Sequence, residues 1–181
     1  KQNAMTLLEA GTGLPKNCTP SEAIALFDSL DPVDLDFMIG RWKGYEVSTG
    51  HPMDGLLDLA NWYGKEFVSP DCVHPLLFSG SNGEVFKVAP NPQMMKLAVG
   101  FPIPDNGLVK SASMLLTSLL KTEDSQARLR MMEHRGKLSA TMIYDHLAIH
   151  DIFRKVDEHT VLGLMDYKEI QQPFFFALKR V

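Results

Sequence analysis

Six histidines are the side chains in this 181-residue chain that titrate closest to neutral pH. They are His51, His74, His134, His146, His150 and His159. None of them falls in the H-E-x-x-H spacing that places two zinc ligands on one helical face. His146 and His150 are four residues apart, with Asp145 and Asp151 beside them. On a helix this cluster would suit a metal ion or proton transfer, but between two strands it is a polar connection whose aspartates cap turns. We favour the polar connection.

A second set of polar residues belongs to segments that alternate as strands do. Glu46 shares one face of RWKGYEVS with Trp42. If this face points inward, the carboxylate needs a partner, which an inward Arg154 or Tyr144 can supply. Such groups in an apolar cavity have the usual composition of a small-molecule site. The alternative is that Glu46 lies in water near the end of its strand.

Two histidines precede prolines and are further candidates for contact with a ligand. His74 lies in the apolar run CVHPLLF, and His51 lies in the turn TGHP. The commoner use of a histidine in such a segment is a hydrogen bond within the fold. Lys65 could anchor an anionic ligand, but we expect it to end a helix, where its charge offsets the helix dipole.

The motifs of the commonest enzyme classes are absent from the sequence. It contains no G-x-S-x-G, no phosphate-binding loop and no dinucleotide fingerprint. A remaining enzyme hypothesis is an isomerase or hydrolase that uses histidine and aspartate as acid and base. Its candidates are His51, His74, Asp145, His150 and Asp151. Whether the protein is an enzyme stays open, its cofactor is unknown, and the sequence indicates no metal.

Composition limits the partners. The formal net charge is -4 and the pI is about 5.8, which argues against binding to a nucleic-acid backbone. No apolar run approaches the ~20 residues that span a bilayer. Cys18 and Cys72 lack metal-type spacing and are expected to be free thiols in a reducing compartment, so we expect a cytoplasmic protein. The sequence leaves a homodimer open.

The chain divides into an N-terminal tail, residues 1–18, and a single β-barrel domain with helices, residues 19–181. Thr19, Pro20 and Glu22 predict a capped helix start. Asp31 is expected to cap a second helix that ends at Gly40, although residues 33–39 also alternate as a strand does. Further helices are expected over 53–64, with Gly64 as the stop, and within 91–100 and 108–119.

The remaining segments predict β-structure. Residues 41–48 read as a strand, and residues 72–90 read as a hairpin around Ser-Gly-Ser-Asn-Gly. Five strand-like runs fill the last third, within residues 127–181. Their regular spacing predicts an antiparallel meander, either closed as a barrel or stacked as a sandwich.

The motif Gly40-x-Trp42-x-Gly44 resembles the first strand of the calycin barrels, which include lipocalins, fatty-acid-binding proteins and nitrobindins. More closely, residues 30–180 resemble the family named for its GXWXG motif, followed by a C-terminal domain of unknown function. The matching segments are GRWKG, TGHPMDGLL, WYGK, HPLLF, RGKLSATMIYD, FRKVDEHTVLGLMD and FFFALKR. The resemblance to lipocalins implies that Trp42 packs against Arg180 at a closed end of the barrel. The resemblance to nitrobindins implies a second alternative, a haem ligated by a histidine such as His74.

The sequence therefore predicts a mainly β (α+β) fold: an antiparallel, calycin-like barrel with N-terminal helices and helical insertions. We expect its cavity to bind a small hydrophobic or amphipathic molecule through polar groups at Glu46, His74, Tyr144 and Arg154, with His51 nearby. The acid–base enzyme is one alternative. Another is a structural protein whose barrel is filled by phenylalanine and methionine.

Overall fold

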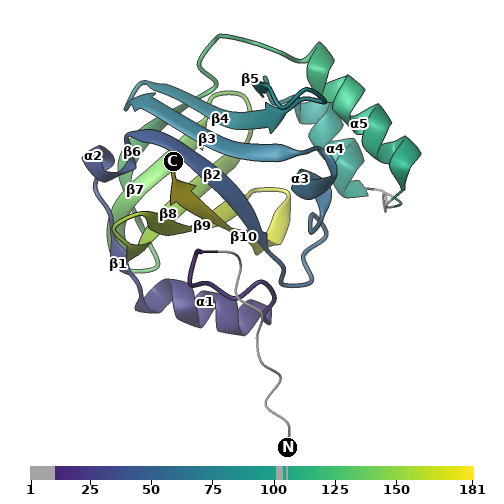
Figure 1. The fold of residues 1–181 in the computed structure, drawn as a ribbon. Helices are drawn as coiled ribbons and strands as arrows, with labels where there is room; N and C mark the ends of the chain where they lie inside the picture. The colour runs from purple at the N-terminus through teal and green to yellow at the C-terminus, as the bar shows by residue number, and fades with distance from the viewer. Residues whose placement is uncertain (1–10, 101–103, 105) are drawn as a thin grey trace, which may run out of the picture.

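Eight antiparallel strands close into a barrel in the computed structural model, which describes residues 11–100, 104 and 106–181 (Figure 1). The order around the ring is β8-β7-β6-β4-β3-β2-β10-β9, and β9 pairs again with β8. These strands are β2 (Gly40–Val47), β3 (Trp62–Ser69), β4 (Cys72–Ser79), β6 (Ala127–His134), β7 (Lys137–Tyr144), β8 (Ile149–Asp157), β9 (Thr160–Tyr167) and β10 (Ile170–Arg180). Two short strands lie outside the ring: β1 (Asp31–Pro32) pairs with β8, and β5 (Val85–Lys87) pairs with β4. The prediction of a mainly β antiparallel fold is confirmed. Of the two arrangements left open, the strands close into a barrel and do not stack as a sandwich.

Alternation along the strands gives the barrel two apolar faces. In β10, Phe174, Phe176 and Leu178 point into the barrel core, while Phe175 and Ala177 point outward. The outward face is covered by α1 (Pro20–Ser29), whose Phe27 ring meets Phe175 edge-on at 6.2 Å. Because both faces are covered in the middle of this strand, the residues from Phe174 to Leu178 are all buried.

Helix α1 begins as its sequence predicts. The Thr19 hydroxyl accepts a hydrogen bond from the Glu22 amide at 3.2 Å, and the Glu22 carboxylate accepts one from the Thr19 amide at 2.8 Å. This capping box satisfies two amides that a helix start would otherwise leave without partners. Before the helix, Leu14 is buried and the Cys18 amide donates a hydrogen bond to the Ser48 carbonyl, so this part of the expected tail packs on the barrel. Residues 1–10 of that tail lie outside the described residues.

Two other expected helices were wrong in extent. Asp34, not Asp31, caps a helix of one turn, α2 (Leu35–Met38), and Asp31 belongs to β1. The helix expected over 53–64 is limited to α3 (Leu56–Leu59). Asn61 adopts a positive φ of 59°, which turns the chain from α3 directly into β3. Gly64 and Lys65 therefore lie within a strand and do not end a helix.

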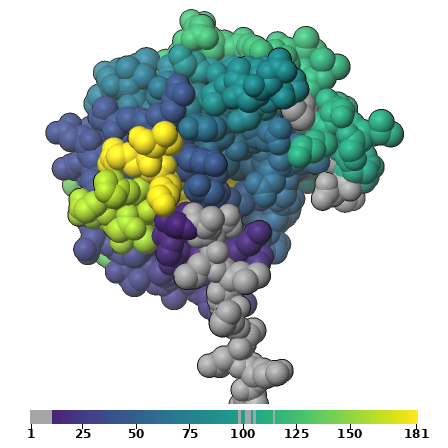
Figure 2. Space-filling model, viewed as in Figure 1, coloured from purple at the N-terminus to yellow at the C-terminus, as the bar shows by residue number. Residues whose placement is uncertain are grey.

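Two predicted helices form the insertion between β5 and β6. They are α4 (Pro92–Gly100) and α5 (Gly107–Leu119), which lie together at one end of the barrel (Figure 1). The space-filling view shows α5 at a projecting edge of the molecule (Figure 2). Its exposed apolar side chains are Leu108, Leu115, Leu116 and Leu119. Within the described part of the chain, no helix combines the length and apolar character needed to cross a membrane.

Trp42 and Arg180 meet where β2 begins and β10 ends. The Arg180 guanidinium lies 4.2 Å from the centroid of the buried Trp42 ring and donates hydrogen bonds to the carbonyls of Ile39 and Phe37. The Trp42 indole N–H donates to the Met38 carbonyl at 2.8 Å. The contact implied by the resemblance to lipocalins is present, and it also fixes α2 across this end of the barrel.

The second glycine of the motif makes room for a different tryptophan. A Cβ atom at Gly44 would lie 2.2 Å from Cη2 of Trp62, which shows that the Trp62 ring rests directly on the Gly44 backbone. A Cβ at Gly163 would likewise lie 2.3 Å from Cζ of Phe176. These two glycines bring the Trp62 and Phe176 rings together, edge to face at 5.9 Å, inside the barrel.

We predict that Gly44→Ala lowers the free energy of unfolding by ~1–3 kcal/mol, since the half-buried Trp62 indole must move to accept the added methyl group. Urea denaturation of the two proteins measures this difference. Gly107→Ala is the matched control, because no atom lies within 4 Å of the added Cβ, and it should change stability by less than ~0.5 kcal/mol. Equal effects of the two substitutions would contradict the proposed contact.

Candidate functional site

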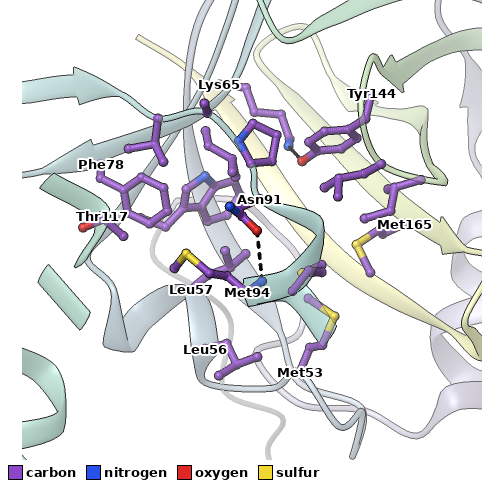
Figure 3. A pocket seen from close by; sticks show the side chains of 18 of the residues that line it. Met53, Leu56, Leu57, Lys65, Phe78, Asn91, Met94, Thr117, Tyr144 and Met165 are labelled. Atoms are coloured by element: carbon purple, nitrogen blue, oxygen red, sulfur yellow. Dashed lines mark hydrogen bonds between the residues drawn. The ribbon is translucent and has the colours of Figure 1, made fainter. Parts of the chain in front are cut away.

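A cavity of about 200 Å³ lies between the barrel interior and helix α4 (Figure 3). Its walls are mainly apolar and come from the α3 segment, several strands, the segment after β5, and α4 and α5. The lining residues are Met53, Leu56, Leu57, Trp62, Lys65, Leu76, Phe78, Val88, Ala89, Pro90, Asn91, Met94, Met95, Thr117, Leu120, Tyr144, Leu147, Ile149, Asp151, Met165, Phe174 and Phe176.

Lys65, Tyr144 and Asp151 form a polar trio in this apolar wall. The Lys65 Nζ atom lies 3.1 Å from Asp151 Oδ2 and 3.4 Å from the Tyr144 hydroxyl oxygen. It also donates a hydrogen bond to the Pro75 carbonyl at 3.1 Å. Figure 3 shows the Lys65 nitrogen beside the Tyr144 hydroxyl at the cavity. Three partners therefore surround one cationic nitrogen.

The backbone register accounts for the meeting of these side chains. Lys65 in β3 is paired with Trp42, and Asp151 in β8 is paired with Met142 and Met165. Strands β3 and β8 are not hydrogen-bonded neighbours in the sheet. Because both side chains point inward, their ion pair crosses the barrel interior and joins two distant parts of its wall.

Aromatic rings complete the surroundings of the Lys65 nitrogen. Nζ lies 5.1 Å from the Phe176 ring centroid and 5.6 Å from the centroids of both Trp62 and Tyr144. The electron-rich face of each ring attracts a cation, by ~1 kcal/mol or more where water is excluded. The trio and these rings thus favour a charged amine despite its burial.

Burial opposes the charges of the pair. It lowers the pKa of Lys65, and the Asp151 carboxylate only partly offsets this. It raises the pKa of Asp151, which Lys65 partly offsets, and it raises the pKa of Tyr144 well above 10. The phenol therefore stays neutral and can donate a proton, while the amine and carboxylate are close enough to exchange one.

One oxygen of the trio has no partner. Asp151 Oδ1 is buried and accepts no hydrogen bond from any described residue. A buried acceptor of this kind costs about 1–3 kcal/mol unless it is satisfied. The Asp151 side chain lines the cavity, so a molecule in the cavity is placed to satisfy it.

Tyr144 lies in the cavity wall, where the sequence placed it, but Arg154 does not. Arg154 points to the outer face, with its guanidinium 4.5 Å from the Phe27 ring centroid, and donates to the His134 carbonyl. Phe153 next to it points inward. The expectation for Arg154 was wrong because a change of one residue in strand phase moves a side chain to the opposite face.

Glu46 points inward with Trp42 but has different partners from those expected. Its two carboxylate oxygens accept hydrogen bonds from the amides of Gly55 at 2.7 Å and Leu57 at 2.9 Å. It therefore holds the segment that contains α3 against the barrel. Burial raises the pKa of Glu46 to about 7, although the two amide bonds act in the opposite direction.

The predicted histidines do not line the cavity. His51 accepts from the Met53 amide through Nδ1 and lies 3.0 Å from the Gln172 carbonyl through Nε2, so the network assigns it the neutral Nε2–H form. Both ring nitrogens of His51 therefore make hydrogen bonds to the chain itself, and the ring does not line the cavity. His74 lies among charges of the outer surface, those of Lys87, Glu66 and Glu123. The expectation that His74 faces the cavity was wrong, because the strand irregularity between Gly64 and Glu66 separates it from the inward residues. Its ligation of a haem stays a prediction.

The polar residues around His146, from Asp145 to Asp151, do not all lie on the same face of the barrel wall. Asp145 is exposed and lies 3.8 Å from Arg128, while His150 alternates with the inward Asp151. Asp151 is thus the sole member of the five acid–base candidates that lines the cavity. Among the described residues, no three histidine, cysteine or acidic side chains lie close enough to hold a metal ion.

Lys65 was weighed as a ligand anchor but expected at a helix end, so the predicted site omits it. The aromatic residues around it in WYGKEFV favour a strand. Asp151 was considered only with the histidines. Lys65 and Asp151 come together only because the barrel closes, and a local sequence pattern does not predict closure.

We predict that Lys65→Met lowers the free energy of unfolding by ~3–5 kcal/mol, because it leaves Asp151 buried without its cation. The double variant Lys65→Met with Asp151→Leu should recover most of this loss. Arg41→Met, which removes the exposed ion pair with Glu66, is the control and should cost at most ~1 kcal/mol. Urea denaturation measures all three, and equal losses in the two single variants would refute a dry ion pair.

We also predict a pH-dependent contribution from Glu46. Because its pKa rises from 4.5 to about 7 on folding, the folded chain keeps a proton that the unfolded chain has released. Stability therefore falls between these pH values, by at most ~3 kcal/mol, relative to a Glu46→Gln variant. Urea denaturation of both proteins at several pH values from 4.5 to 8 tests this, and two parallel stability curves would contradict it.

Comparisons with known proteins agree with this architecture. Residues 25–83 match the family model described as GXWXG protein, and residues 125–180 match the domain of unknown function DUF4334. A crystal structure of a protein from Thermomonospora curvata is 31% identical in sequence, with a TM-score of 0.69 over 92% of this chain and 90% of that chain. The comparison with curated proteins gives no match. The chain belongs to the family of GXWXG proteins that carry this C-terminal domain of unknown function.

Proposed function

We propose that the barrel binds a small molecule with an apolar body and one polar end. The polar end contacts Lys65, Tyr144 and Asp151, and the apolar body contacts the surrounding hydrophobic walls. The observation that carries the proposal is the buried Asp151 Oδ1 without a partner at the cavity. A hydroxyl, an amine or a water bound with the ligand would supply the missing donor.

The Tyr144 hydroxyl provides a hydrogen-bond donor, which complements the acceptor oxygen of Asp151. It accepts a hydrogen bond from Lys65, which leaves its own hydrogen for another acceptor. A ligand whose polar group both donates and accepts, such as an alcohol or a hydrated carbonyl, can therefore bind Asp151 and Tyr144 together. An isolated permanent anion is less suitable, because Asp151 would repel it.

The size of the cavity indicates a short ligand. The cavity volume is about 200 Å³. This is below the ~300–1,000 Å³ of sites for drug-sized ligands. Met94 and Met95 form part of the wall, and their flexible side chains can adapt to molecules of slightly different length.

The same trio supports a second candidate function, acid–base catalysis. Of the residues expected to serve it, Asp151 lines the cavity, and Lys65 and Tyr144 supply two further groups that carry protons. The cavity argues against the other alternative, a structural protein whose barrel is filled by its own side chains. The cytoplasmic location and the homodimer stay predictions.

We predict that six- and seven-carbon alcohols bind to the full chain with saturable heat in calorimetric titrations. Met94→Trp fills part of the cavity and should weaken binding of 1-hexanol at least tenfold. Leu97→Trp on the same helix is the control, because Leu97 is exposed and does not line the cavity, and it should bind as the wild type does. Native mass spectrometry of the purified protein provides a separate search for a bound molecule. Absence of binding by every alcohol together with an empty native spectrum would refute the proposal.

A further inference from the structure

We propose that Lys65 forms a reversible imine with a short aldehyde or ketone bound in the cavity. This inference rests on the proposed function and names a class of ligand for the same site. Its basis is the placement of an amine, a proton acceptor and a proton donor around one point of a dry, apolar wall.

The amine is available inside the cavity and shielded outside it. The Lys65 side chain is 3% exposed, and among the described residues that line the cavity it alone carries an amine. A carbonyl compound must therefore enter the cavity to reach it. Apolar walls formed by residues such as Trp62 and Phe176 limit the access of water, which would hydrolyse the product.

Asp151 supplies the first proton acceptor. The ammonium of Lys65 transfers a proton to the carboxylate 3.1 Å away, which frees the nitrogen lone pair. Burial favours this transfer, since it disfavours both charged groups. The nitrogen then attacks the carbonyl carbon and forms the C–N bond, while the C=O π electrons move to oxygen.

Tyr144 is placed to assist the oxygen. Its hydroxyl lies 3.4 Å from Lys65 Nζ and can donate a hydrogen bond to the developing oxyanion. One N–H proton then moves to this oxygen, which gives the neutral carbinolamine. Asp151 returns its proton to the hydroxyl, the C–O bond breaks, and water leaves as the nitrogen lone pair forms the C=N bond.

The net charge of the site is the same before and after the proposed reaction. The product is a protonated imine on Lys65 beside the Asp151 carboxylate, together with one water molecule. No oxidant or reductant takes part. The ring faces that surround the ammonium, those of Phe176, Trp62 and Tyr144, then surround the iminium cation.

The test uses the full chain with hexanal and sodium cyanoborohydride, which reduces an imine to a stable secondary amine. Intact mass spectrometry counts the adducts, and peptide mapping locates them. We expect rapid modification of Lys65, and excess 1-hexanol should slow it at least fivefold without protecting exposed lysines such as Lys96 and Lys110. Modification confined to exposed lysines would overturn the inference.

Variants separate chemistry from folding. Tyr144→Phe should slow trapping at Lys65 at least tenfold when the two proteins are compared at hexanal concentrations that saturate the cavity, because the variant lacks the donor to the developing oxyanion. Lys65→Arg should abolish the adduct at this position, and if that variant does not fold, the peptide map of the wild type still decides the site.

Binding and trapping also fail in distinguishable ways. If 1-hexanol binds but hexanal leaves Lys65 unmodified, the imine is refuted and the binding function stands. If no alcohol or aldehyde binds and Lys65 is unmodified, both proposals fail.

Discussion

The ion pair between Lys65 and Asp151 is the constraint on which the interior of this barrel depends. Removing two charges from water costs more than their attraction returns unless other groups compensate. Here the compensation comes from the Pro75 carbonyl, the Tyr144 hydroxyl and three aromatic rings. Two of these rings, those of Trp62 and Phe176, lie against Gly44 and Gly163, where an added Cβ would collide with them. The positions of two glycines, two rings and two charges are thus one connected arrangement.

This arrangement differs from a core built for stability alone. A barrel interior of phenylalanine and methionine would hold together without a buried lysine, and it would need no partner for Asp151 Oδ1. The opposite end of the same barrel is closed by Trp42 and Arg180, whose hydrogen bonds all have partners in α2 and the residue after it. The side-chain donors of Trp42 and Arg180 therefore reach carbonyls of the chain itself, whereas the region around Lys65 is incomplete, because Asp151 Oδ1 has no partner among the described residues. The incomplete region is where a ligand has the most to contribute.

The features that the sequence predicted well depend on neighbours in the chain. The capping box of Thr19 and Glu22, the β4–β5 hairpin and the five C-terminal strands follow from local spacing, and all are present. The contact between Trp42 and Arg180 came from the family resemblance. By contrast, Arg154 was assigned to the wrong face because strand phase was unknown, and Lys65 was assigned to the wrong element because the helical spacing of Leu56 and Leu57 was extended too far.

The polar trio itself could not be predicted from spacing. Lys65 and Asp151 are separated by 85 intervening residues and lie in strands that are not neighbours, so only the closed ring brings them together. The separation also explains why the sequence points to histidines and not to Lys65: histidine titrates near neutral pH in most settings, whereas a lysine does so only when it is buried. Burial, which sequence does not state, is what makes Lys65 unusual.

The insertion that carries Met94 and Met95 has a separate consequence. The groups that would recognise a ligand's polar end belong to the barrel strands, whereas these methionines belong to a helix inserted between β5 and β6. Under the proposed function, selectivity for the polar end and selectivity for chain length would therefore be encoded in different stretches of the polypeptide. Substitutions confined to α4 would then change the length of the accepted molecule and leave the polar groups of the strands in place.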